Sequence, residues 1–273
     1  MLFVPKLDAS RPTVDKSVAQ YLNGRAEFHL NSYSDSELTN VLLIADAQHL
    51  NEIVLHAPFG KHALEIVCMS DALYAEAEKL VRVLSDWERK LCRSVTLLYH
   101  VSLPVESLRH LPVLEKFGHL LGISSIKFLL ENSYANLSAG KKRMQEDPIL
   151  YVLSSVSNNR VSMCFDLCHH MASCYVLKEE YSFNEGWCMY ITQVHFSDTK
   201  NCEGYIHSDV THGRAHSNMW EVARDLCQLR AYGIDLSKAA IVTEISESDY
   251  LLRPEQVREL RMLYQAEKSL HIV

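Results

Sequence analysis

The residues of this chain that could do chemistry are carboxylates and imidazoles placed at the ends of short apolar runs. The clearest case is Val161–Ser173, which reads VSMCFDLCHHMAS: Asp166 closes an apolar run, and His169 and His170 follow it closely. A buried strand can end in such a group only if the group is paired, protonated or bound to a metal ion. This stretch therefore predicts a metal ligand at a strand end, with a histidine on the loop that leaves the strand.

Other apolar runs end in the same way, and their polar end groups would converge if the strands form a barrel. The end groups are His56, His100, Glu131, Asp166, His195 and Glu244. Because side chains alternate along a strand, Glu131 shares a face with Leu129 and His195 shares a face with Gln193, so both can point inward. Three carboxylates and one imidazole would be supplied by Glu131, Asp166, His195 and Glu244. Such a mixed shell favours Mn²⁺, Mg²⁺ or Co²⁺, whereas further histidines would favour Zn²⁺.

Apolar runs alternate with amphipathic stretches along the whole chain, as expected for strands that are each followed by a helix. Helix starts are marked by a capping box at Ser34–Glu37 and by Asp147 followed by Pro148, and Thr13 is expected to cap a shorter helix. The expected strands are Leu2–Leu7, Glu27–Asn31, Asn51–His56, Val95–His100, Ile126–Glu131, Val161–Asp166, Tyr190–His195 and Ala239–Glu244.

These expected strands are close to continuously apolar, which indicates that both faces of the sheet are covered, as in a parallel sheet. Eight strand–helix units without an intervening linker or repeat predict a single domain over residues 1–273. Such a chain closes most naturally into an α/β fold, a single (β/α)8 TIM barrel. In that fold the chemistry lies at the carboxyl-terminal ends of the strands, where the polar end groups of this sequence stand.

Composition narrows the class of protein. Of the 273 residues, 48% are hydrophobic, which is enough for a sizeable core. The net charge of −7 and the lack of a Lys/Arg block do not indicate a nucleic-acid partner, although a local basic groove is compatible with this total. Eight cysteines without a CxxC pair favour a reducing, cytoplasmic location. No apolar run reaches about 18 residues, so no membrane span is expected, and the N-terminus MLFVPKLDASRP has Pro and Asp where a secretory signal would need a long apolar core.

Six strand-end motifs carry a family resemblance: LHAPF, LYH, LLEN, FDLCH, VHFSD and VTEI. In this order and spacing they resemble the xylose-isomerase-like TIM barrel superfamily, which includes sugar isomerases and epimerases and the apurinic-site endonucleases of family 2. The resemblance covers nearly the whole chain. It is much more specific for the superfamily than for the reaction.

The epimerase-like pattern implies a divalent-metal-dependent isomerase or epimerase in carbohydrate metabolism, acting on a sugar, sugar phosphate or polyol. It places one ion, Mn²⁺ or Zn²⁺ with Mg²⁺ or Co²⁺ as alternatives, on the four-residue set Glu131, Asp166, His195 and Glu244. In such enzymes the metal holds two adjacent sugar oxygens. Glu131 and Glu244 would then remove a proton from carbon and return it through an enediolate. His169 would contact the substrate.

The endonuclease-like pattern implies a phosphodiesterase with several zinc ions and a DNA partner. His56 and His100 would hold a second ion together with Glu131. Several ions help phosphodiester cleavage because they activate water and neutralise the leaving oxygen together.

A third ion in that pattern would need His169 and two residues from the loop after the seventh strand, GYIHSDVTHGRAH. Asp209 with His212, or His207 with Asp209, could supply these ligands. The Asp-x-His spacing of the pattern is absent in that order, so this sequence departs from it at the third ion.

Plainer interpretations stand beside these. His56 and His100 could be satisfied core histidines, and the four-residue set could be a structural polar network. The loop histidines His170, His207 and His216 are expected to face solvent. Lys200 and Arg214 could bind a substrate phosphate or carboxylate, with His56 as a further substrate contact, or could be ordinary surface charge. A non-catalytic barrel and a homo-oligomer remain open alternatives.

Overall fold

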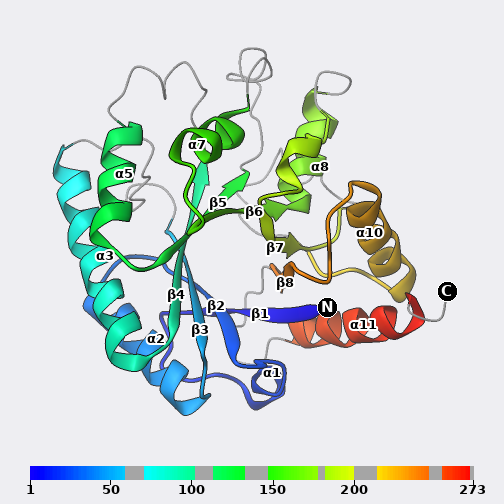
Figure 1. The fold of residues 1–273 in the computed structure, drawn as a ribbon. Helices are drawn as coiled ribbons and strands as arrows, with labels where there is room; N and C mark the ends of the chain where they lie inside the picture. Colours follow the sequence, from blue (N-terminus) through cyan, green and yellow to red (C-terminus); the bar gives the residue numbers. More distant parts are fainter. Residues whose placement is uncertain are drawn as a thin grey trace.

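The fold is a closed parallel barrel, seen in a computed structural model that describes residues 1–58, 71–101, 113–132, 147–177, 182–199, 214–245 and 254–270. Eight strands follow one another around the barrel in chain order, and β8 pairs with β1 (Figure 1). The strands are β1 (Leu2–Asp8), β2 (Arg25–His29), β3 (Glu52–His56), β4 (Ser94–Val101), β5 (Lys127–Asn132), β6 (Val161–Asp166), β7 (Ile191–Phe196) and β8 (Ala240–Thr243). The (β/α)8 TIM barrel predicted from the sequence is confirmed.

Helices surround the barrel, with α2, α3 and α5 on one side and α10 and α11 on the other (Figure 1). The described helices are α1 (Lys16–Ala19), α2 (Asp35–Ala47), α3 (Asp71–Leu91), α5 (Val113–Ile123), α7 (Pro148–Val156), α8 (Leu167–Leu177), η3 (Glu185–Trp187), α10 (Met219–Ala231) and α11 (Pro254–Leu270). In the part of the chain that the structure describes, no helix combines the length and apolarity that crossing a membrane requires.

Two of the predicted helix caps are confirmed and one is wrong. The Ser34 side chain accepts a hydrogen bond from the Glu37 N–H at the start of α2, and the Asp147 carboxylate accepts from two N–H groups of α7. Helix α1 is capped by Asp15 rather than by Thr13. The Asp15 carboxylate reaches the N–H of Ser17, where it satisfies a donor that the first turn leaves without an intrahelical partner.

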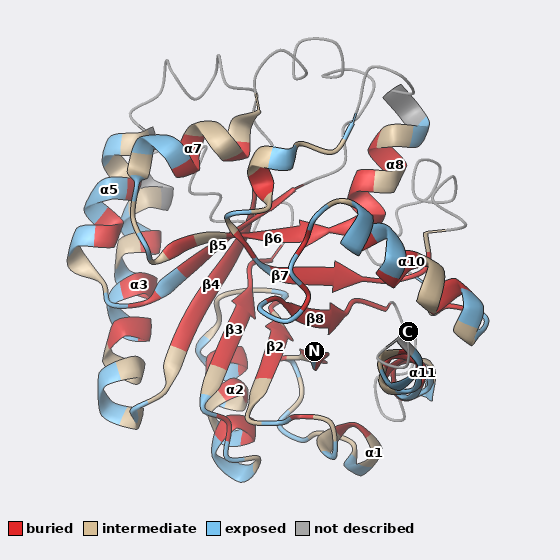
Figure 2. Ribbon diagram, turned by 45° about the vertical axis from the view of Figure 1, so that its right-hand side comes forward, coloured by how far each residue is buried: buried red, intermediate tan, exposed pale blue. Residues whose placement is uncertain are grey.

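Burial is concentrated in the strands and on the helix faces that cover them (Figure 2). Inside the barrel, two groups of buried apolar side chains precede the polar strand ends: Val54, Leu98, Leu129 and Cys164 in one, and Val4, Ala240 and Val242 in the other. Because side chains alternate across a strand, the next inward position lies two residues further along. At that level the barrel carries polar side chains, so the fold places a charged layer directly above an apolar floor.

Candidate metal centre

Four polar side chains meet at the carboxyl-terminal ends of β5 to β8. They are Glu131, Asp166, His195 and Glu244, here called the four-residue cluster, and one potential ligand atom of each lies within 4.8 Å of the others. Asp166 is the register partner of His195, and the Glu244 N–H donates to the Phe196 carbonyl oxygen at 3.1 Å. Each of the four is at most 3% exposed. The structure thus brings together the groups singled out in the sequence, and their role as ligands remains a prediction.

The imidazole of His195 lies at the centre of the cluster. Its Nδ1 atom is 3.0 Å from Glu131 Oε1, 2.5 Å from Glu244 Oε2 and 3.8 Å from Asp166 Oδ2. Burial alone would lower the pKa of His195, but Cys164 and the surrounding carboxylates raise it well above its ordinary value. Three carboxylate oxygens around Nδ1 of His195 therefore strongly favour a positive charge at this point.

Burial and neighbouring charges act on the pKa values of the cluster's carboxylates in opposing directions. Burial would raise the pKa of Glu131, but the imidazoles of His100 and His195 hold it well below its ordinary value. Burial raises the pKa of Asp166 to about 6; His169 opposes this rise, and the charges of Glu244 and Glu131 add to it. A divalent cation would relieve this repulsion, and a shell of three carboxylates and one imidazole suits Mn²⁺, Mg²⁺, Co²⁺ or Zn²⁺. The donor set therefore fits a metal ion.

A second group of potential ligands shares Glu131 with the first. Glu131 Oε2 lies 3.2 Å from His56 Nε2 and 3.3 Å from His100 Nε2. His56 Nδ1 lies 3.0 Å from the Ala57 carbonyl oxygen, so an N–H at Nδ1 would donate to that oxygen and leave the Nε2 lone pair directed at Glu131. Backbone carbonyls often orient metal-binding histidines in this way. The two oxygens of Glu131 thus face two different groups.

His169 lies beside the cluster, but on the first turn of α8 and not on a loop as expected. Helix α8 begins directly after β6 because the Asp166 carboxylate accepts from the His169 N–H at 2.6 Å and so caps the helix. His169 Nδ1 lies 2.9 Å from the Asn132 carbonyl oxygen and 3.6 Å from both Glu131 Oε1 and Asp166 Oδ2. The side chain is therefore in place to contact a molecule bound at the cluster.

The structure says little about the remaining predicted site residues. Lys200, His207, Asp209 and His212 lie outside the described residues. Arg214 is described and exposed, and its carbonyl oxygen accepts from the Asp198 N–H at 2.8 Å. Its proposed role as a substrate contact therefore stays a prediction.

Comparisons with known proteins give a clear structural answer but no sequence match. No family model matches, and no curated protein matches by sequence. An L-ribulose 3-epimerase superposes with a TM-score of 0.55 at 14% identity, over 98% of this chain and 96% of its own. An AP endonuclease of family 2 from Brucella melitensis gives 0.53 at 13% identity, over 96% and 98%. A xylose isomerase-like TIM barrel/4-hydroxyphenylpyruvate dioxygenase fusion protein gives 0.59 at 14%, over 98% of this chain and 43% of its own. The fold is that of the xylose-isomerase-like TIM barrels.

Two charged residues at the cluster were missed from the sequence. Lys6 on β1 bonds to Glu244 Oε1, and its Nζ atom lies 3.2 Å from Glu27 Oε1 on β2. Burial would lower the pKa of Lys6, but Glu244 and Glu27 raise it above its ordinary value, so the side chain is an ammonium. The available signal was a charged residue inside each of two apolar strands, LFVPKLD and RAEFH. Attention to strand ends alone passed over both.

Two histidines expected to face solvent are buried in this barrel. His170 is 1% exposed and packs among the rings of Phe165, Phe183, Trp187 and Tyr232. The expectation was wrong because it placed His170 on a loop, whereas α8 turns the ring onto this aromatic group.

His216 is fully buried, and its two ring nitrogens contact Glu259 and Asp225. With Asp198 and Asp225 it forms another group of potential ligands. The guanidinium of Arg224 already lies 2.6 Å from Asp225 Oδ1. This group is therefore a neutralised structural network that joins the segment before α10 to α10 and α11.

Proposed function

We propose that the protein is a divalent-metal-dependent isomerase or epimerase of a sugar, a sugar phosphate or a polyol. The observation that carries the proposal is the buried four-residue cluster at the carboxyl-terminal rim of the barrel. The shared fold with an L-ribulose 3-epimerase and with a D-allulose 3-epimerase from Methylomonas sp. supports it. A cluster of this kind would be costly in a structural role, because several carboxylates are removed from water together.

Glu131 and Glu244 are the proposed acid and base. They come from β5 and from the end of β8, and their carboxylates reach His195 from these separate strands. A divalent ion bound here would act as a Lewis acid that stabilises the negative charge of an enediolate. One glutamate would remove the proton from the substrate carbon and the other would return a proton to it. Lys6 adds a fixed positive charge beside Glu244.

Solvent isotope exchange tests this proposal most directly. Incubation of the purified protein and Mn²⁺ with candidate sugars in D₂O should place deuterium on the substrate carbon, and a chelator should abolish the exchange. Glu131→Gln and Glu244→Gln should each remove it. The control is Glu37→Gln, a buried glutamate that accepts from the N–H groups of Asn31 and Ser32 at 3.0 Å. Undiminished exchange in both site variants would refute the mechanism.

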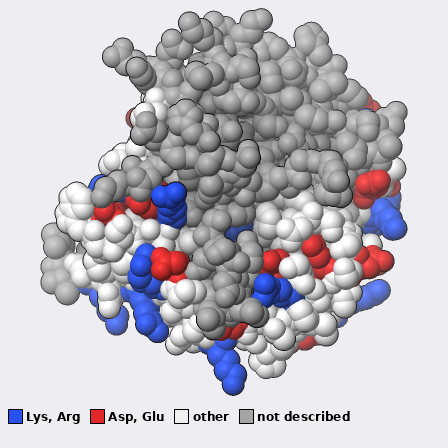
Figure 3. Space-filling view, turned by 180° about the vertical axis from the view of Figure 1, so that it is seen from behind, with Lys and Arg blue, Asp and Glu red and all other residues white. Residues whose placement is uncertain are grey.

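A second candidate function is a phosphodiesterase acting on abasic DNA with a multinuclear zinc site. The observation that favours it is the group formed by His56, His100 and Glu131, which adjoins the first cluster. The fold is also that of a family 2 AP endonuclease. Charge argues against it: the net charge is −7, and basic and acidic side chains of the described residues are interspersed on the face shown in Figure 3.

Counting ions per chain separates the two candidates. After dialysis against Zn²⁺ or Mn²⁺, one ion per chain together with carbon-bound proton exchange supports the isomerase. Two or three ions together with nicking of an abasic duplex support the phosphodiesterase. Replacement of both His56 and His100 by Asn should remove one ion only in the second case.

A further inference from the structure

Behind the four-residue cluster lies a pair of buried charged residues, Lys6 and Glu27. They are register partners on β1 and β2, and they are 5% and 0% exposed. Two charges removed from water carry a penalty of several kcal/mol each unless close partners satisfy them. Since neither residue belongs to the four-residue cluster, the contacts of Glu27 need an explanation of their own.

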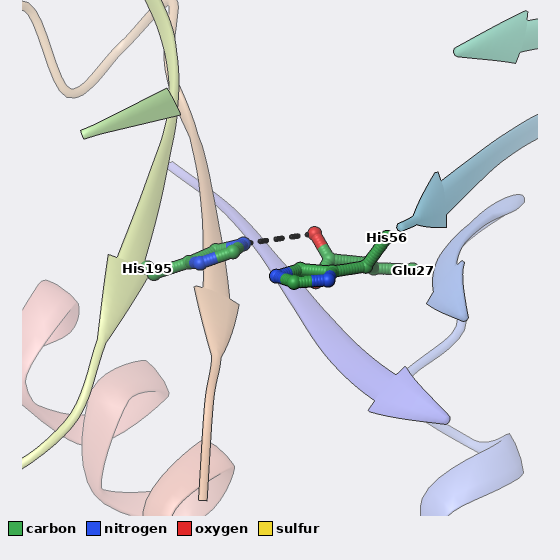
Figure 4. Close-up of side chains that lie close together, drawn as sticks. All are labelled: Glu27, His56 and His195. Carbon is green, nitrogen blue, oxygen red and sulfur yellow. Dashed lines mark hydrogen bonds and ion pairs between the residues drawn. The ribbon is translucent and has the colours of Figure 1, made fainter. Parts of the chain in front are cut away.

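Glu27 contacts the ring nitrogen of His195 that points away from the cluster. Glu27 Oε2 lies 3.0 Å from His195 Nε2, and Figure 4 shows the two side chains facing each other. His195 Nδ1, on the other side of the ring, faces the carboxylates of the cluster. A carboxylate on one ring nitrogen fixes the orientation of the ring and leaves the lone pair on the other nitrogen.

Other polar groups hold the Glu27 carboxylate itself in place. Gln193 Nε2 donates to Glu27 Oε2 at 2.6 Å, and Arg25 Nη2 donates to Gln193 Oε1 at 2.5 Å. The Lys6 ammonium lies 3.2 Å from the other oxygen, Glu27 Oε1. Both oxygens are therefore engaged, and Glu27 presents one defined acceptor to His195.

We propose that Glu27 is a positioning residue for the candidate metal centre, which it serves by holding His195 so that Nδ1 is the ligand atom. This inference rests on the proposed function. The competing use of Glu27 is as a ligand of a further cation together with His56 and His195, whose ligand atoms also lie within reach of one another. The Lys6 ammonium already supplies positive charge at that point, which leaves Glu27 the role of hydrogen-bond acceptor.

The test compares Zn²⁺ affinities of the full chain, measured by competition with a chromophoric chelator. Glu27→Gln should weaken Zn²⁺ binding by about 10- to 100-fold, the range found when outer carboxylates of metal-binding histidines are replaced. Glu37→Gln makes the same change at a buried glutamate away from the cluster and should leave the affinity unchanged. A merely structural role for Glu27 would lower thermal stability without lowering the affinity of the folded protein.

Nitrogen NMR of the zinc-loaded, ¹⁵N-histidine-labelled wild type gives a second readout that needs no variant at Glu27. The His195 signals, identified by their loss in His195→Gln, should show zinc on Nδ1 and a proton on Nε2. Zinc on Nε2, or equal affinities of the wild type and Glu27→Gln, would overturn the inference and leave the proposed function intact. A wild type that binds neither Zn²⁺ nor Mn²⁺ would overturn the proposed function, and the inference with it.

Discussion

Glu131 is the residue on which the chemistry of this barrel depends most, because its two oxygens serve two different groups. Oε1 lies 3.0 Å from His195 Nδ1, whereas Oε2 lies within 3.3 Å of the Nε2 atoms of His56 and His100. A carboxylate in this position can bind one ion or bridge two. Glu131 would therefore be a ligand whether the site holds one ion or several.

Replacement of Glu131 should therefore lower metal affinity more than any change outside the ligand set. We expect Glu131→Gln to weaken Zn²⁺ binding by more than about 100-fold, since the replacement of outer residues alone reaches that level. Elemental analysis after dialysis at a fixed free Zn²⁺ concentration would measure it. The comparison variant is Glu259→Gln, which removes a buried charge next to His216 instead. An unchanged ion content in Glu131→Gln would show that the ions bind elsewhere.

His216 should make the stability of the protein depend on pH. Burial lowers its pKa, but hydrogen bonds to Asp225 and Glu259 raise it from 6.5 to about 9. Because the folded-state value is the higher one, this stabilisation is fully present below pH 6.5 and is lost as the pH rises through about 9. The loss should be on the order of 3 kcal/mol.

Urea denaturation of the wild type and of His216→Asn at pH 6 and pH 10 would measure this effect. The charged groups that face His216 are Asp225, Glu259 and Asp198, with Arg224 beside Asp225 and the Arg258 guanidinium bonded to the His216 carbonyl oxygen. The wild type should lose more free energy of unfolding than the variant between these two pH values. Equal losses would assign the pH dependence to other groups.

At the level of residues, the sequence predicted which side chains would converge but not how they would be supported. Asp166 and Glu244 were found because each is the polar residue that ends an apolar run, and the end of such a run is visible in the sequence. Lys6 and Glu27 were missed because they lie inside apolar strands rather than at strand ends, and their contact with each other depends on the pairing of β1 with β2. The partner of a buried charge cannot be read from its own neighbours in sequence.

Among the elements, α7 has the start signal that is most completely visible in the sequence. Asp147 Oδ1 accepts from the N–H groups of Ile149 and Leu150 at 2.9 and 3.1 Å, and its Oδ2 accepts from Asn184 Nδ2 at 3.2 Å. Pro148 occupies the first turn, where its missing N–H is not needed. The cap therefore also ties α7 to the segment before β7.

Removal of this cap should destabilise the protein modestly. Asp147→Ala should lower the free energy of unfolding by about 1 kcal/mol for the lost cap, and slightly more because the bond to Asn184 is lost as well. Asp147→Asn, which retains an acceptor, should cost less. Chemical denaturation would measure both, with Ser154→Ala on the exposed face of α7 as the control. Equal stability of Asp147→Ala and the wild type would show that the cap contributes nothing.

Helix α8 is an element whose start the sequence did not predict. The apolar run through Val161–Ser173 indicated a strand followed by a loop, whereas the structure has a strand followed at once by a helix. The reason is that Asp166 has two roles, as it belongs to the four-residue cluster and accepts the His169 N–H. A residue kept for chemistry can thus cap a helix without a separate capping residue.

For the molecule as a whole, closure of the barrel brings the side chains at the ends of different strands together in one site. The strands are in chain order around the barrel, so neighbours in sequence order are neighbours in space. His100 is the register partner of Glu131, and Asp166 is the register partner of His195. The order and the number of strands were predictable, whereas this exact register follows only from the closed sheet.

Binding of a metal ion at this level should stabilise the entire barrel, because ligands from four consecutive strands are joined by one ion. Binding to the folded state alone adds about 2.7 kcal/mol to the free energy of unfolding when the free ion is at 100 times its Kd. For a chain of this size, that should raise Tm by roughly 5 °C. Thermal unfolding at increasing Mn²⁺ or Zn²⁺, followed by circular dichroism, would measure the shift. Glu131→Gln should not show this rise in Tm at the same ion concentration. An ion that raises Tm equally in both proteins would be binding outside the four-residue cluster.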